Sequence, residues 1–204
     1  MTRWLRSIDR SKDNAAYYTV PGIGAFFRWR LRAAADLLNG ERRSRLLDVG
    51  YGSGLLLDEL RGRADHLFGV DRHCYHGAAR QRARAQGLLF HPTRGDVLAL
   101  PFRGEALDVV FCISLLEHVP DLLHAVNEIR RVLRPNGVLI AGFPPKSRLT
   151  ALCFKAIGFD YARHHPNSEA AILAALASCF VVDCVVLRPR VAPLYVVTRC
   201  TRKE

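Results

Sequence analysis

The chain has 204 residues, of which 50% are hydrophobic, and a formal net charge of +11 at pH 7. This length fits one compact domain with its own core, because domains usually contain about 100–200 residues. No apolar run approaches the roughly 18 residues of a membrane-spanning helix, and the opening residues MTRWLRSIDRSKD lack the apolar segment of a secretory signal. Composition therefore predicts a globular, cytoplasmic protein and excludes an integral membrane protein.

The basic surplus consists of 30 Lys and Arg against 19 Asp and Glu. Such a surplus is compatible with a nucleic acid or an anionic membrane as partner. The basic residues are nevertheless scattered along the chain, and scattered charge is more typical of a solvated surface. The sequence allows nucleic-acid binding but does not indicate it.

The N-terminal segment, residues 1–44, is a polar arm followed by a helix. The helix is predicted at FFRWRLRAAADLLNG, residues 26–40, because its apolar residues recur at helical spacing and Asn39-Gly40 is a typical helix end.

From residue 45 to residue 143, short apolar strands alternate with helices. Strands are predicted at 46–50, 66–71, 88–96, 107–113 and 138–144, and helices at 55–62, 78–87 and 121–133, the last ending at the turn 134–137. This alternation predicts right-handed crossovers and a mostly parallel sheet with helices on both faces.

Residues 144–204 complete the predicted domain. After an irregular stretch at 144–167, a helix is predicted at 168–178 with Ser168 as its N-cap. Strands at 180–187 and 194–200 follow and are expected to form an antiparallel hairpin. The whole chain is thus predicted to be a single doubly wound α/β domain with a seven-stranded sheet, in which 45–143 bind the cofactor and 144–204 lie on the acceptor side.

The strongest motif is LLDVGYGSG, residues 46–54, in which three glycines follow a strand and open a helix. Glycine allows positive φ and lets a ligand approach the backbone closely, as cofactor loops at the carboxyl end of a strand require. A dinucleotide fingerprint would place its third glycine at position 55, which is Leu55, and a phosphate-binding P-loop would need a lysine that is absent. The pattern is DxGxGxG, beginning at Asp48.

This pattern resembles motif I of the class I S-adenosylmethionine-dependent methyltransferases. Further family elements follow in order across residues 45–143: GVD ending at Asp71, GDVLALPF around Asp96, Glu117-His118 after the fourth strand, and LRPNGVLIAGFP, where Asn136 replaces a glycine. The resemblance implies S-adenosylmethionine as cofactor. The implied cofactor-binding residues are Asp48, Gly50, Tyr51, Gly52, Gly54, Asp71, Arg72, Asp96, Val97, Ile113 and Ser114.

The resemblance also implies roles for these residues. Asp71 would accept hydrogen bonds from both ribose hydroxyls. Asp96 would accept from the exocyclic amine of adenine, and the backbone amide of Val97 would donate to a ring nitrogen. The reaction would be an in-line methyl transfer in which the protein mainly positions the reactants, with a general base needed only if the acceptor keeps its proton until attack.

His118 is the candidate base, because it follows the fourth strand near the meeting point of cofactor and acceptor; the alternative is that it packs the crossover. The irregular stretch offers acceptor-binding candidates, although it could equally be a solvated loop. An aromatic pair near the N-terminus could form a lid over the cofactor, could rest with neighbouring arginines on a membrane or an anionic partner, or could simply pack on the sheet. These acceptor-side candidates are Tyr17, Tyr18, Tyr161, His164 and His165.

No metal site is predicted. His73, Cys74 and His76 lie close in sequence, but no second ligand pair with zinc spacing accompanies them. The segment after the fourth strand reads ISLLEH, without the Asp/Asn-Pro-Pro-Tyr signature of family members that methylate exocyclic amines, and Cys112 is not preceded by the proline of cytosine-carbon methyltransferases.

The sequence therefore favours a small-molecule or lipid-like acceptor. An RNA or protein methyltransferase and a non-catalytic cofactor-binding protein remain as alternatives, and the sequence does not indicate an oligomeric state.

Overall fold

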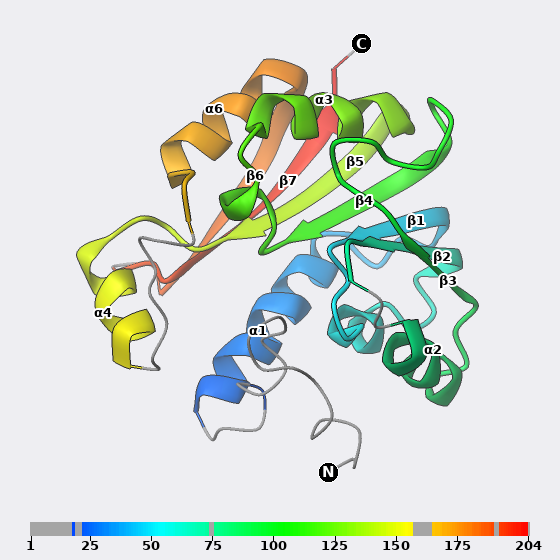
Figure 1. Cartoon of the computed structure of the whole chain (residues 1–204), viewed down its shortest axis with the longest axis horizontal. Coiled ribbons are helices and arrows are strands. Elements are labelled where there is room, and N and C mark those ends of the chain that lie inside the picture. Colours follow the sequence, from blue (N-terminus) through cyan, green and yellow to red (C-terminus); the bar gives the residue numbers. More distant parts are fainter. Residues whose placement is uncertain (1–17, 19–21, 74–75, 157–164, 190–191, 204) are drawn as a thin grey trace.

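The computed structural model describes residues 18, 22–73, 76–156, 165–189 and 192–203. They form a seven-stranded sheet in the order β3-β2-β1-β4-β5-β7-β6. Its first five strands pair in parallel, and β7 runs antiparallel to both β5 and β6 (Figure 1). The predicted doubly wound sheet and its terminal antiparallel hairpin are confirmed. The strands are β1 (Arg43–Val49), β2 (Ala64–Asp71), β3 (Phe90–Arg94), β4 (Leu107–Ile113), β5 (Leu133–Phe143), β6 (Phe180–Arg188) and β7 (Tyr195–Arg202).

Helices cover both faces of the sheet (Figure 1). On one face lie α3 (Leu122–Val132) and α6 (Glu169–Cys179); on the other lie α1 (Ile23–Asp36), α2 (His76–Ala85) and the short 3-10 helix η3 (Leu55–Glu59). A second 3-10 helix, η4 (Leu116–His118), follows β4, and α4 (Arg148–Ala156) follows β5.

The central strands are buried on both sides, as their apolar sequences predict. In β4, Val110 and Cys112 join the core beneath α3 and α6, whereas Val109 and Phe111 join the core beneath α1 and η3. Burying a large apolar side chain contributes about 1.5–3 kcal/mol relative to leaving it exposed. These two cores hold the carboxyl ends of β1 and β4 side by side.

Three predictions of local structure were wrong. The helix predicted at 55–62 is a 3-10 helix over Leu55–Glu59, which ends before Gly62 at a φ of 73°. The turn predicted at 134–137 belongs to β5, where Asn136 has the left-handed φ of 60° that asparagine tolerates. The stretch predicted as irregular at 144–167 contains α4.

Helix α4 begins after Ser147, whose hydroxyl accepts a hydrogen bond from the Thr150 amide at 3.0 Å. The preceding Pro144-Pro145 suggested a loop and concealed this start. The predicted cap of α6 is confirmed, since the Ser168 hydroxyl accepts from the Ala171 amide at 3.2 Å. Within the described part of the chain, every helix is too short or too polar to cross a bilayer.

Candidate functional site

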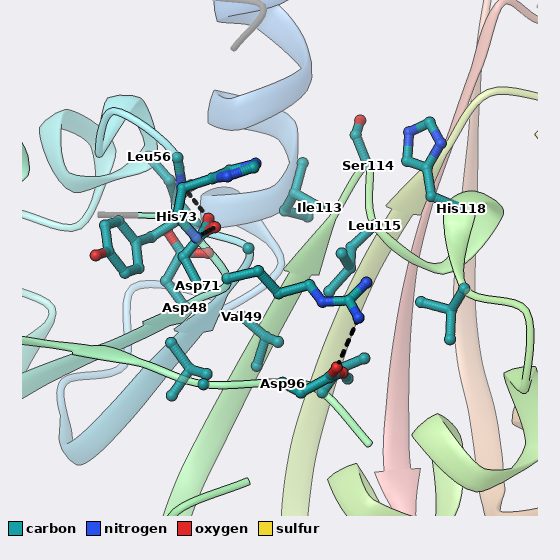
Figure 2. Close-up of a pocket in the computed structure, with 18 of the residues that line it drawn as sticks. Asp48, Val49, Leu56, Asp71, His73, Asp96, Ile113, Ser114, Leu115 and His118 are labelled. Carbon is teal, nitrogen blue, oxygen red and sulfur yellow. Dashed lines mark hydrogen bonds and ion pairs between the residues drawn. The ribbon is translucent and has the colours of Figure 1, made fainter. Parts of the chain in front are cut away.

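A cavity of about 560 Å³ opens at the carboxyl ends of β1 and β4, which are neighbours in the sheet. The chain leaves these strands toward opposite edges of the sheet, and ligands of open α/β sheets bind in the resulting crevice. Twelve predicted site residues line the cavity: Tyr18, Asp48, Gly50, Tyr51, Gly52, Asp71, Arg72, Asp96, Val97, Ile113, Ser114 and His118. Figure 2 shows Asp71 and His73 on one side of the cavity and Ser114 and His118 on the other.

The glycine-rich loop after β1 forms one wall. Gly50 has a φ of 76°, which an L side chain rarely adopts, and its amide donates to Val70 O at 2.7 Å. Gly54 does not line the cavity. A Cβ there would lie 3.2 Å from Ala79 Cα, so the glycine serves the close packing of the loop against α2.

Asp71 ends β2 and is fixed by this loop. Its Oδ2 accepts from the Gly52 amide at 2.8 Å, and its Oδ1 accepts from the His73 amide at 2.9 Å. A carboxylate oxygen has about two acceptor positions. Each oxygen of Asp71 therefore keeps one position for a ligand in the cavity.

Asp48 lies at the end of β1, beneath the loop, with only 3% of its surface exposed. Burial, helped by the nearby charge of Asp71, raises the pKa of Asp48 to about 8. Two carboxyl groups thus face one cavity wall. A ligand that carries positive charge suits this wall, because a nearby cation favours the ionised form of the buried Asp48.

Asp96 lies beyond β3 in an ordered turn. Its Oδ1 accepts from the Leu98 amide at 3.1 Å, and its Oδ2 pairs with Arg72 at 3.0 Å. The Arg72 side chain is 75% exposed, and an exposed ion pair of this kind contributes about 0–1 kcal/mol. Arg72 can therefore release Asp96 to a ligand at little cost.

Arg30 of α1 lines the cavity and was missed from the sequence. Its guanidinium donates to Ser114 Oγ at 2.8 Å and to Tyr18 Oη at 3.2 Å, and it stacks on Phe27. Burial acts to lower the pKa of Arg30, but neighbouring Tyr18 and Tyr195 together with Glu117 raise it, so the group stays charged. The sequence did offer one signal for Arg30, because this charged residue lies on the side of the helix that carries the buried apolar residues.

Ser114 follows β4 and holds a φ of 55°, an unusual conformation for a residue with a side chain. Its hydroxyl is also 2.7 Å from Tyr195 Oη. The two hydrogen bonds to Ser114 keep the strained residue in place at the centre of the cavity. Strain of this type is found mainly at functional sites.

The predicted acceptor-side residues divide into three groups. Tyr18 and His118 line the cavity, and His118 is exposed. His165 is buried outside the lining, with its ring 4.6 Å from that of His118. Tyr17, Tyr161 and His164 lie outside the described residues. His118 and His165 therefore come together, although 46 residues separate them in the sequence.

The comparison with protein families decides the assignment of this fold. Residues 47–141 match the family model described as "Methyltransferase domain". This stretch of the chain is therefore similar to that family of methyltransferase domains. The matched residues include the glycine-rich loop, Asp71, Asp96 and His118, so the methyltransferase motifs predicted from the sequence are the ones that line the cavity.

Curated methyltransferases with similar sequences include two whose names refer to quinones. The chain is 34% identical over 116 residues to the ubiquinone biosynthesis O-methyltransferase of Histophilus somni, covering 54% of this chain and 49% of the relative. It is 37% identical over 127 residues to the demethylmenaquinone methyltransferase of Thermus thermophilus, covering 60% and 57%. The chain thus spans about half the length of these relatives.

Solved structures of other proteins have the same fold. The PH0226 protein from Pyrococcus horikoshii matches with a TM-score of 0.72 and 17% identity over 100% of both chains. The magnesium protoporphyrin IX methyltransferase from Synechocystis, solved with bound SAH, matches with a TM-score of 0.69 and 21% identity, covering 87% of this chain and 84% of that one. At these identities the likeness concerns the fold alone.

Proposed function

We propose that this protein is an S-adenosylmethionine-dependent methyltransferase whose acceptor is a small, lipid-like molecule of the quinone type. The observation that carries the proposal is the Asp71 carboxylate, fixed by the amides of Gly52 and His73 with one acceptor position left on each oxygen. Two neighbouring ribose hydroxyls match this arrangement.

The remaining cavity residues fit the other parts of this cofactor. Asp96 and the Val97 amide suit the amine and a ring nitrogen of adenine, as the sequence motif implies. The positive charge of Arg30 suits the carboxylate of the methionine part. Asp48, beside the loop, suits the positive charges of the sulfonium and the ammonium.

When bound, the cofactor supplies an electrophilic methyl group that an acceptor lone pair can attack in line. The protein's own task is then to hold the two reactants close together and correctly oriented. This positioning can lower the activation barrier of methyl transfer by roughly 7–11 kcal/mol. The loop at Gly50 and Gly52 and the Asp71 carboxylate fix one reactant. His118 lies across the cavity from Asp71 (Figure 2), and we propose that it removes a proton from a hydroxyl acceptor.

A lipid-like acceptor is supported by the apolar residues on the His118 side of the cavity. Ile113, Leu115 and Val119 line it there, and apolar linings with a few polar groups are typical of small-molecule sites. The relatives described above are named for ubiquinone biosynthesis and for demethylmenaquinone, which supports a quinone-type acceptor for this chain. We further propose that the whole chain works as one domain, since Arg30 comes from the N-terminal segment and the cofactor motifs from the centre.

The test is product analysis with methyl-labelled S-adenosylmethionine. The protein is incubated with this cofactor and a host cell extract, and the label is followed into lipid, small-molecule, RNA and protein fractions. We expect label in the lipid fraction. At a cofactor concentration well below the dissociation constants of both proteins, the Asp71→Ala variant should give about 10- to 100-fold less label.

Two results would contradict the proposal. Label confined to RNA or protein would show that the acceptor class is wrong. Absence of cofactor binding by calorimetry in a folded sample would show that the protein is not a methyltransferase of this type.

A further inference from the structure

Three potential metal ligands meet beside the cavity. Glu117 and His118 are consecutive residues of η4, just after β4, and His165 precedes α6. One ligand atom from each residue lies within 4.8 Å of those of the other two. This cluster combines two imidazoles with one carboxylate.

A hydrogen-bond clamp holds His165 against η4. The Asn167 side chain donates to Leu116 O at 2.8 Å and to Val119 O at 2.7 Å, and its backbone amide donates to Glu117 O at 3.4 Å. Asn167 thus ties the segment before α6 to both ends of η4. The cluster is therefore built on fixed backbone from two distant parts of the chain.

Glu117 is unusual within this cluster. Only 1% of its surface is exposed, and among the described residues its Oε2 has no hydrogen-bond partner. The nearby Arg30 directs its amino groups to Ser114 and Tyr18 instead. A buried carboxylate normally requires a donor or a cation, so Glu117 has an unfilled acceptor beside two imidazoles.

We propose that Glu117, His118 and His165 form a binding site for a first-row divalent cation, with Zn²⁺ as the best match. Two histidines and one glutamate are the ligand set of one class of catalytic zinc sites, in which a fourth position holds water or substrate. Glu117 and His165 are buried, whereas His118 is exposed and lines the cavity. The ion enters from the His118 side, and its open position faces the cavity.

The open position has a chemical consequence. With the ion bound, His118 serves as a ligand instead of as the base, and the ion would hold an oxygen atom of the acceptor and favour its deprotonated form. This role rests on the proposed methyltransferase function, whereas the metal site itself does not. The sequence prediction of no metal site considered only His73, Cys74 and His76, because nothing in the spacing connects Glu117 with His165.

The experiment is a titration of the full-length, metal-free protein with Co²⁺, in the absence of cofactor, followed by competition with Zn²⁺. Co²⁺ at a site of this kind gives visible absorption bands. We expect one equivalent to bind and Zn²⁺ to displace it. Glu117→Gln and His165→Ala should each weaken Zn²⁺ binding by about 100-fold or more, because loss of even an outer partner of a metal ligand costs 10–100-fold.

Glu117→Gln keeps the shape of the side chain and removes the buried charge, so this variant should melt at or above the melting temperature of the metal-free parent protein. The matched control is the double variant His66→Ala/His91→Ala. These two rings lie 6.0 Å apart on β2 and β3, where they could take up Zn²⁺ adventitiously. The control should leave the one-equivalent binding unchanged.

The proposal is overturned if no Co²⁺ bands appear, if Glu117→Gln binds Zn²⁺ as tightly as the parent, or if the control variant abolishes binding. Calorimetry of S-adenosylmethionine with the same metal-free sample separates the two proposals. Cofactor binding without Co²⁺ binding refutes the metal site alone, and Co²⁺ binding without cofactor binding refutes the methyltransferase proposal alone.

Discussion

Replacing Asp71 with alanine tests the assignment of the cavity. The wild-type carboxylate has one acceptor position per oxygen committed to the amides of Gly52 and His73. Two positions remain for the ribose hydroxyls. Asp71→Ala removes both and also frees the loop amide of Gly52, so it should weaken cofactor binding without removing any part of the core.

The size of the effect follows from these two hydrogen bonds. A hydrogen bond to a charged group contributes about 1.5–3 kcal/mol. The two bonds together set an upper bound of about 3–6 kcal/mol. Water that fills the space left by the carboxylate pairs with the hydroxyls and the freed amides, so we expect a smaller net loss of roughly 1.4–2.8 kcal/mol for the pair. This corresponds to a dissociation constant about 10- to 100-fold higher.

The assay is isothermal titration calorimetry with S-adenosylmethionine and with 5′-methylthioadenosine, which keeps the ribose and lacks the amino-acid part. Asp71→Ala should weaken both ligands by the same factor. The matched control is Asp65→Ala, which removes another carboxylate from β2, one that pairs with Arg42 at 2.7 Å on the surface. Unchanged affinity of a folded Asp71→Ala protein would refute the placement of the ribose.

Three further variants test other parts of the site. Arg30→Met should weaken S-adenosylmethionine about 10-fold or more and leave 5′-methylthioadenosine unchanged, because only the former has the carboxylate that Arg30 would bind; equal effects on both ligands would refute that role. His118→Ala should lower kcat by about 10²- to 10⁴-fold while the dissociation constant of the cofactor changes little; a proportional loss of both in a turnover assay would make His118 a binding residue. Asp48→Asn should raise the melting temperature at pH 8 and hardly change it at pH 4. Burial raises the pKa of Asp48 in the folded protein to about 8. The wild-type protein therefore loses stability as the pH rises from about 4 to 8. A wild-type melting temperature that does not fall over this range would show that the burial of Asp48 does not destabilise the fold.

The cofactor half of the cavity could be predicted from the sequence because its constraints are local. The DxGxGxG spacing places Gly50 and Gly52 directly after a strand, and Asp71 ends the next strand of the same sheet. Parallel strands bring their carboxyl ends to one edge, so the order of motifs along the chain is sufficient to gather them. Gly54 shows the limit of this reasoning, since its conformation serves packing against α2 and not the cavity.

The other half of the cavity depends on contacts between segments far apart in the sequence, which motif spacing cannot predict. Arg30 was missed because arginine on a helix normally faces solvent, whereas here it is buried between Ser114, Tyr18 and aromatic rings. The meeting of His118 with His165 depends on the Asn167 clamp, which joins segments 48 residues apart. Helix α4 was missed for a different reason: the prolines before it gave a local signal for a loop.

Three polar residues in and beside the cavity oppose folding. Asp48 and Glu117 are buried carboxyl groups whose pKa values burial raises to about 8, and Ser114 holds a strained backbone conformation. In a domain whose net stability is about 5–15 kcal/mol, such features persist only where selection for function retains them. They converge on one cavity from β1 and from the segment after β4. A cationic cofactor beside Asp48 and a metal ion beside Glu117 would each relieve one of these costs, so ligand binding should stabilise the fold at the points where the unliganded protein is least favourable.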